Sequence, residues 1–160
     1  MLQSTLVAVQ TLLAEQRVLA LAVTLPPAGV PQAGLLPFVP LPDCSGVLVH
    51  ASRLARHSAG LAPEAVASAL IHEGDAVGKD PLQLRRVTFA CRVRPLERDS
   101  AEWLAGRGRY LARFADAAVT FDLGDFTLYE LAFESGLYIA GFGRAIALTG
   151  DDIVRLAQPT

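Results

Sequence analysis

The stretch Leu84–Leu96 constrains the fold more than any other part of the chain, because apolar and polar side chains alternate along it. In an extended strand, successive side chains point to opposite faces. The pattern therefore predicts a strand with one face toward a core and one strongly cationic face, and the cationic face could simply be solvated. The core face carries Arg85, Val87, Phe89, Cys91 and Val93, and the other carries Leu84, Arg86, Thr88, Ala90, Arg92 and Arg94.

Six further apolar segments have the length of strands and are separated by turn residues. Turns are predicted at Pro26–Pro31, at Pro42–Gly46 and, as a tight hairpin, at Ser135-Gly136. Pro37 and Pro40 cannot donate to a ladder, so they mark an edge, a bulge or a place where the ladder opens. The predicted strands are Arg17–Leu25, Gly34–Leu41, Gly46–His50, Val66–His72, Phe126–Glu134 and Leu137–Leu148.

Helices are predicted at intervals between the strands. An amphipathic helix runs from Leu2 to about Gln16, and a short helix over Arg53–Gly60 has Ser52 as its N-cap. A third helix, capped by Asp99 or Ser100, would run to Phe114, and a fourth would begin at Asp151. The buried stripe of the third helix is predicted to consist of Trp103, Leu104, Tyr110, Leu111 and Phe114.

Many short strands with helices between them, and no alternating βαβ rhythm, predict a mainly β (α+β) fold built on an antiparallel barrel. The 160 residues fit one domain, 1–160. A net charge of −2 argues against nucleic acid as a partner, and the 52% hydrophobic content fits an oligomer interface. Cys44 and Cys91 lack the spacing of a zinc site or a disulfide framework. No signal peptide or membrane span is expected, so the expected location is the cytoplasm.

The turn after the third predicted strand gathers groups that could bind an anion. Ser52, Arg53, Arg56, His57 and Ser58 follow one another within two helical turns. Guanidinium, imidazole and hydroxyl groups supply a phosphate with both charge and directional donors. The alternative is a solvated basic helix.

Four segments resemble the FMN-binding split-barrel superfamily, in its pyridoxamine 5′-phosphate oxidase-like and haem-utilisation branch. Ser52–Ser58 is similar to its Ser-x-Leu-Ala-x-His-Thr motif, and the other three segments follow in the same order along nearly the whole chain. They are Leu84–Thr88, Arg109–Phe114 followed by Leu123–Phe126, and Gly141–Ala145. The resemblance implies a split barrel that forms a homodimer, with the flavin in a groove between the subunits.

The resemblance also suggests roles for particular residues. Ser52, Arg53, His57 and Ser58 would bind the FMN phosphate, and the main chain around Leu36 and Pro37 would border the flavin ring. Arg86 would reach the flavin from a central strand, although it could equally belong to a solvated face. Phe142 would be a wall of the site, or else a core residue at a bulge, and Arg144 a substrate anchor. His50 and His72 are expected to be capping or surface residues.

Two positions depart from the family pattern, since glycine stands at Gly34 and Gly60 where a hydroxyl residue and an asparagine are usual. Two side-chain hydrogen bonds to the flavin would therefore be missing, each worth about 0.5–1.5 kcal/mol. No hydrolase motif, metal site or catalytic residue can be assigned from the sequence.

The function predicted first is an FMN-dependent oxidoreductase of unknown substrate. The alternative is a non-catalytic dimeric split-barrel module that binds flavin or haem. Haem is the less expected ligand, because haem-degrading relatives use a histidine in a C-terminal extension, whereas His72 is the last histidine here. Haem oxygenase activity is therefore expected to be absent or feeble.

Overall fold

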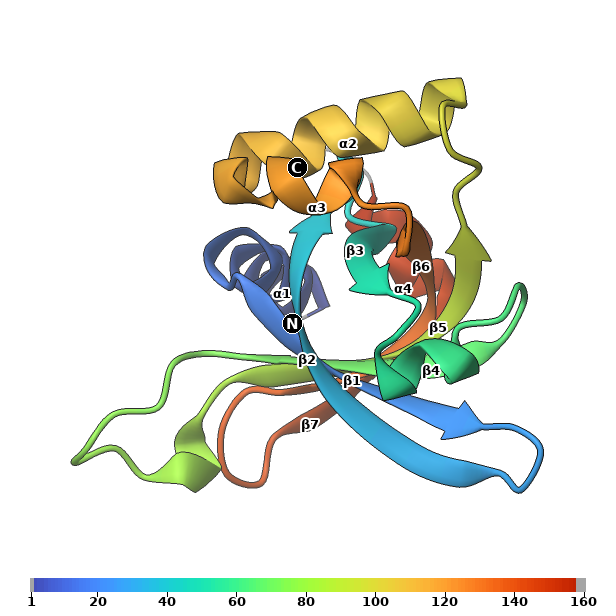
Figure 1. The fold of residues 1–160 in the computed structure, drawn as a ribbon. Coiled ribbons are helices and arrows are strands. Elements are labelled where there is room, and N and C mark those ends of the chain that lie inside the picture. The colour runs from blue at the N-terminus through green and yellow to red at the C-terminus, as the bar shows by residue number, and fades with distance from the viewer. Residues whose placement is uncertain (1, 158–160) are drawn as a thin grey trace.

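A computed structural model describes residues 2–157 of the chain. Figure 1 shows α2 and α3 together at one end of the molecule and β7 at the opposite end. The strands are β1 (Val18–Leu25), β2 (Val30–Pro40), β3 (Gly46–Ser52), β4 (Val66–His72), β5 (Arg86–Pro95), β6 (Phe126–Ile139) and β7 (Ala145–Leu148). The α-helices are α1 (Leu2–Glu15), α2 (Ala101–Arg113), α3 (Ala118–Asp122) and α4 (Gly150–Leu156), and the 3₁₀ helices are η1 (Arg56–Gly60), η2 (Pro81–Gln83) and η3 (Ala115–Ala117).

The strands form one antiparallel sheet in the order β3-β2-β1-β4-β5-β6-β7, and β3 also pairs with β6. This second pairing closes six strands into a barrel and leaves β7 as an extra strand on β6. The length of β6 makes closure possible, because Phe126–Ala132 pairs with β3 whereas Gly136–Ile139 pairs with β7. The predicted α+β split barrel is confirmed.

The barrel core is the apolar cluster inside the barrel and under α1 and α4. Val87, Phe89, Cys91 and Val93 are fully buried in it, which confirms the alternation seen in the sequence. Phe89 stacks on Phe133 with 3.7 Å between ring centroids. Helix α1 covers the core with its predicted apolar face, on which Leu6, Val9, Leu12 and Leu13 are buried.

A second apolar group, the helix-side cluster, lies between the outer surface of the barrel and α2. Its buried members are Val39, Leu48, Leu96, Trp103, Tyr110, Phe121 and Leu128. The predicted N-cap of α2 is confirmed, since the Ser100 hydroxyl accepts a hydrogen bond from the Trp103 amide at 3.1 Å. Leu104 was predicted to be buried but is 55% exposed, because Gly106 occupies the face of α2 that meets the barrel.

Strand β6 continues through Ser135 and Gly136, so the hairpin turn predicted there is wrong. Gly136 pairs with Phe89 of β5, and a Cβ atom at position 136 would lie 3.0 Å from the Phe89 ring. The glycine therefore permits a close approach within the sheet instead of a reversal of the chain. The chain turns further on, where Gly141 (φ 130°) and Gly143 (φ 74°) adopt left-handed backbone.

Two other boundaries also differ from the predictions. Strand β2 begins at Val30 instead of Gly34, because the hairpin turn closes with Gly29 (φ 74°) and pairs Leu25 with Val30. Strand β3 runs through Ser52, which pairs with Phe126. Ser52 is therefore not a helix N-cap, and the helix predicted over residues 53–60 shortens to η1.

Pro37 marks the place where the ladder between β2 and β3 opens, which is one of the alternatives predicted for the two prolines, whereas Pro40 still pairs with Val47. Only Phe38, Val39 and Pro40 pair with β3, whereas pairing with β1 extends along the whole strand from Val30 to Pro37. The part of β2 around Leu36 is therefore not paired with β3. No helix among residues 2–157 is long and apolar enough to cross a membrane.

Candidate functional site

A cavity of about 300 Å³ opens where the β2 ladder leaves β3. Its walls come from β2, β3, η1, α2 and the segment around α3, so distant parts of the chain meet there. The lining residues are Leu36, Pro37, His50, Ala51, Ser52, Ala55, His57, Tyr110, Ala117, Thr120 and Phe126. Four predicted site residues, Leu36, Pro37, Ser52 and His57, are thereby brought to one cavity, the His57 cavity.

His57 projects from η1 against the opened edge of β2. A Cβ atom at position 34 would lie 2.7 Å from its Nδ1, so Gly34 leaves the space that the imidazole fills. The other ring nitrogen, Nε2, is buried and has no hydrogen-bond partner among residues 2–157. Burial lowers the pKa of His57 below its ordinary value, because the charged form loses hydration. His57 is therefore neutral at pH 7, and its buried Nε2 has no partner in the described part of the chain.

Gly60 is crowded in a similar way, since a Cβ atom there would lie 2.6 Å from the Val23 side chain. Both departures from the family pattern thus have a packing reason. Side chains at positions 34 and 60 would collide with His57 and with β1 unless the backbone moved.

His50 lies deeper in the same cavity and is only 7% exposed, so its prediction as a capping or surface residue is wrong. Its ring stacks on Phe121 at 3.8 Å between centroids, and its Nδ1 lies 3.2 Å from the Thr120 hydroxyl. Burial, with a smaller effect of the positive charge on Arg98, lowers the pKa of His50 to about 4. His72, by contrast, is exposed at the end of β4, as predicted.

The two hydroxyl groups predicted to bind a phosphate already donate hydrogen bonds within the protein. The Ser52 hydroxyl donates to the Asp125 carboxylate at 2.7 Å, and the Ser58 hydroxyl donates to the Ser52 carbonyl at 2.6 Å. A phosphate dianion needs donors, and the Asp125 carboxylate would repel it. These contacts weaken the predicted phosphate site at Ser52 and Ser58.

Cationic side chains gather beside the His57 cavity instead. A neighbouring hollow of about 510 Å³ is lined by Arg53, Arg56, Ser58 and Tyr129, among others. One Nη of Arg53 donates to the Gly124 carbonyl at 2.8 Å. Arg56 is exposed at this hollow, and its guanidinium makes no hydrogen bond or ion pair with any residue in the described part of the chain.

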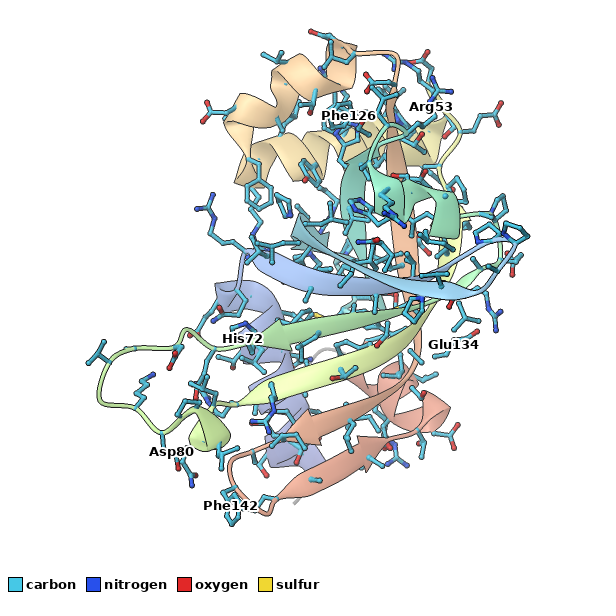
Figure 2. All side chains as sticks on the ribbon, turned by 60° about the horizontal axis from the view of Figure 1, so that its bottom comes forward. Arg53, His72, Asp80, Phe126, Glu134 and Phe142 are labelled. Atoms are coloured by element: carbon cyan, nitrogen blue, oxygen red, sulfur yellow. The ribbon has the colours of Figure 1, made fainter. Side chains whose placement is uncertain are left out.

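Arg86 and Phe142 do not join this site within one chain. Arg86 pairs with His72 and Ile139 across the sheet, and its Nη1 donates to the Leu84 carbonyl at 2.9 Å. Phe142 is 70% exposed in the turn between β6 and β7. Figure 2 shows Phe142 and His72 away from the end of the molecule that carries Arg53 and Phe126.

The sequence reasoning missed three further residues of the cavity, Tyr110, Thr120 and Phe126. Tyr110 and Phe126 lie in segments that resemble the family, but no role in the site was predicted for them. The Tyr110 hydroxyl donates to the Pro37 carbonyl at 3.5 Å. Burial raises the pKa of Tyr110 to about 12. Only the crossing of α2 over the opened ladder reveals that these residues share a cavity with His57.

No family model matches the sequence. The heme oxygenase HutZ of Vibrio cholerae is 33% identical over 143 residues, which cover 88% of this chain and 78% of that protein. The crystal structure of HutZ, the heme storage protein from the same organism, superposes with a TM-score of 0.71 at 25% identity, over 88% of this chain and 92% of that one.

A heme binding protein from Mycobacterium smegmatis superposes with a TM-score of 0.81 at 28% identity over 94% of this chain. The match covers 60% of that structure, so this chain spans about three-fifths of its length. By sequence and by fold, the chain belongs to the HutZ family, and its fold is also that of a protein of the pyridoxinephosphate oxidase family from Clostridium acetobutylicum, with a TM-score of 0.70 at 12% identity.

Proposed function

We propose that this protein binds haem at the His57 cavity. The observation that carries the proposal is the buried His57 Nε2, a lone imidazole nitrogen without a partner among the described residues, in a cavity with mainly apolar walls. A buried polar atom without a partner costs free energy unless a ligand satisfies it. The haem-related names of HutZ and of the mycobacterial protein point to the same class of ligand.

Each part of the cavity suits one part of a haem. The neutral imidazole of His57 has the protonation state needed to hold a haem iron through nitrogen. Leu36, Pro37 and Phe126 offer apolar surface to a macrocycle, and Arg53 and Arg56 stand nearby to pair with carboxylates. Bound haem would supply an iron centre for binding or activating oxygen. The residues of the chain would bind and orient the haem and exclude water from the cavity.

A haem titration followed in the Soret region tests the proposal. The wild type should form a saturable one-to-one complex, and His57→Ala should weaken it at least about tenfold, because the imidazole is lost. His72→Ala is the matched control and should leave the affinity unchanged. A broad spectral shift that no histidine substitution alters would reject the proposal. The expectation of absent or feeble oxygenase activity stays a prediction, and product formation with a reductant would check it.

FMN is the second candidate ligand, and one observation favours it. The cavity unites Leu36 and Pro37 with Ser52 and His57, which are the positions that the family resemblance assigns to the ring and the phosphate. An FMN-dependent oxidoreductase predicts yellow protein and quenching of added FMN fluorescence. His57→Ala should then weaken FMN binding instead of haem binding, so this one variant separates the two candidates.

We further propose that the protein is a homodimer. An apolar row crosses the outer face of the sheet, because Leu35, Ala20, Leu70, Thr88 and Leu137 are successive cross-strand neighbours. Leu35 and Leu137 are 70% and 45% exposed. Neighbouring exposed apolar residues of this kind mark interaction surfaces.

Pairing of two copies over this face would also explain why Arg86 and Phe142 lie apart from the cavity of their own chain. Size-exclusion chromatography with light scattering is the test. A strict monomer at micromolar concentration would reject the dimer without bearing on the haem titration.

A further inference from the structure

We propose a second binding site, for a free α-amino acid with an apolar side chain, in a cavity beneath helix α2. The cavity has a volume of about 210 Å³ and lies between α2 and the outer surface of the barrel, beside the turn that follows β2. It shares no lining residue with the His57 cavity or with the arginine-lined hollow beside it. Pockets for drug-sized molecules have volumes of about 300–1,000 Å³, so the ligand of this one is small.

Arg109 supplies the positive charge and an unused donor. One Nη of Arg109 donates to the Pro40 carbonyl at 2.8 Å, which fixes the guanidinium at the end of β2. Its Nε is buried and has no hydrogen-bond partner among residues 2–157, with which the guanidinium also forms no ion pair. Asp43, in the turn after β2, accepts hydrogen bonds from Ser45 instead. Because an unpaired buried N–H group costs free energy, an acceptor from a ligand would be favourable here.

A second charged group in the lining of the cavity has the opposite sign. Arg94 of β5 donates to Glu102 of α2 at 2.5 Å and to Glu130 of β6 at 2.7 Å. One guanidinium between two carboxylates leaves this group with an excess of one negative charge. Both glutamates use Oε2 for Arg94, so Oε1 of each can still accept a hydrogen bond from a ligand.

The remaining lining is apolar. Leu48 and Leu96 are buried members of the helix-side cluster, and Leu41 packs against that cluster. Gly106 of α2 also lines the cavity, and a Cβ atom there would lie 3.2 Å from the Leu48 side chain. The glycine therefore leaves space between the helix and these leucines.

A zwitterion with an apolar side chain matches these three parts of the lining. Its carboxylate would bind Arg109, its ammonium group would bind Glu102 or Glu130, and its side chain would cover the leucines. A free α-amino acid carries both charges at neutral pH. A simple anion or a simple cation would gain only one of the two charged contacts, and the charged group of its own sign would repel it.

Isothermal titration calorimetry with L-leucine tests this site. The wild type should show saturable one-to-one binding. Leucine methyl ester lacks the carboxylate and N-acetylleucine lacks the ammonium group, so each should bind at least about tenfold more weakly than leucine. Glycine should also bind at least about tenfold more weakly, because it buries no apolar side chain.

Substitutions in the protein test the same contacts. Arg109→Gln should weaken leucine binding about tenfold, and Glu102→Gln, at an exposed position, about three- to tenfold. Arg107→Gln is the matched control, because it removes a charge from the same helix outside the cavity lining, and it should have no effect. His57→Ala should bind leucine like the wild type, so this test is independent of the proposed haem site.

Circular dichroism shows whether each variant is folded, and amide resonances of Leu48 and Ala105 should shift as leucine is added. If Arg109→Gln does not fold, Glu102→Gln and the two leucine derivatives still decide the outcome. The proposal fails if leucine binding is not saturable or if both derivatives bind as tightly as leucine. It also fails if the folded variants at Arg109 and Glu102 bind leucine like the wild type.

Discussion

The two apolar clusters of this protein differ in composition and in what borders them. The barrel core is largely aliphatic, with Phe89 and Phe133 stacked inside it. The helix-side cluster is richer in aromatic residues, and two of them carry polar ends, the Trp103 indole and the Tyr110 hydroxyl. Both clusters reach the His57 cavity, the barrel core through Leu36 and Ala51 and the helix-side cluster through Tyr110 and the stacking of His50 on Phe121.

This difference affects what each cluster can offer a ligand. Aliphatic side chains on paired strands bury area without offering hydrogen bonds, so the aliphatic part of the barrel core contributes stability and, at Leu36 and Ala51, an apolar wall. Aromatic residues with a polar end can pack on one side and face a ligand on the other. Substitutions in the barrel core away from Leu36 and Ala51 should therefore lower stability without altering the site, whereas those in the helix-side cluster should change both.

The largest expected effect is that of Phe89→Ala. Removing a fully buried ring from the barrel core should lower the free energy of unfolding by about 3–5 kcal/mol, as urea denaturation would measure. Molecules that remain folded should bind haem like the wild type. Leu104→Ala, at a half-exposed position of α2, is the control and should cost less than about 1 kcal/mol. Equal costs for both substitutions would contradict the assigned packing.

The next effect is a pH dependence due to His50. Its pKa falls from 6.5 to about 4 on folding, so between these values the unfolded state binds more protons than the folded state. Stability should therefore fall as the pH drops from 6.5 to 4, by about 3 kcal/mol in total, and this contribution should stay constant below pH 4.

The measurement compares urea denaturation of the wild type and His50→Asn at several pH values. Carboxylates and His57 affect both proteins alike, so the difference between them isolates His50. If the free energy of unfolding changed with pH in the same way for the wild type and for His50→Asn, the pKa of His50 would not be lowered by folding.

The sequence predicted those parts of the fold whose signals are local. The alternation of β5 and the Ser100 cap depend on neighbours within a few residues, and both are confirmed. The course of β6 could not be predicted, because Gly136 acquires its role from Phe89, which is distant in the sequence. A glycine between apolar segments indicates a turn until the partner strand is known.

The residues of the site also divide into those predictable from local sequence and those that depend on the tertiary fold. The position of His57 after β3 and of Leu36 on β2 could be predicted from short motifs, and the structure places both in one cavity. The burial of His50 depends on α2 and α3, which only the tertiary fold brings over β3. The hydrogen bond from Ser52 to Asp125 is likewise nonlocal, so the loss of this phosphate donor was not visible in the sequence.

Gly34→Ser should have a smaller effect on stability but a specific one on the site. A Cβ atom at position 34 would lie 2.7 Å from His57 Nδ1, so the imidazole or the strand must move, at a cost of about 1–3 kcal/mol. Haem affinity should fall as well, measured by the Soret titration. Gly74→Ser, where no atom lies within 4 Å of the added Cβ, is the control. A gain in FMN affinity would instead support the flavin candidate, because the usual hydroxyl would have been restored.

The smallest expected effect compares two glycines of α2 that lie on different faces. Alanine at an open helical position stabilises by about 0.5–1 kcal/mol, because glycine loses more backbone entropy on folding. Gly108 has no atom within 4 Å of an added Cβ, so Gly108→Ala should gain this amount. At Gly106 an added Cβ atom would lie 3.0 Å from the Leu128 side chain and 3.2 Å from the Leu48 side chain. These side chains of the helix-side cluster would have to shift to make room for it. Gly106→Ala should therefore be less stable than Gly108→Ala by about 1 kcal/mol in urea denaturation. Equal gains at both positions would show that this cluster is loosely packed beside the cavity.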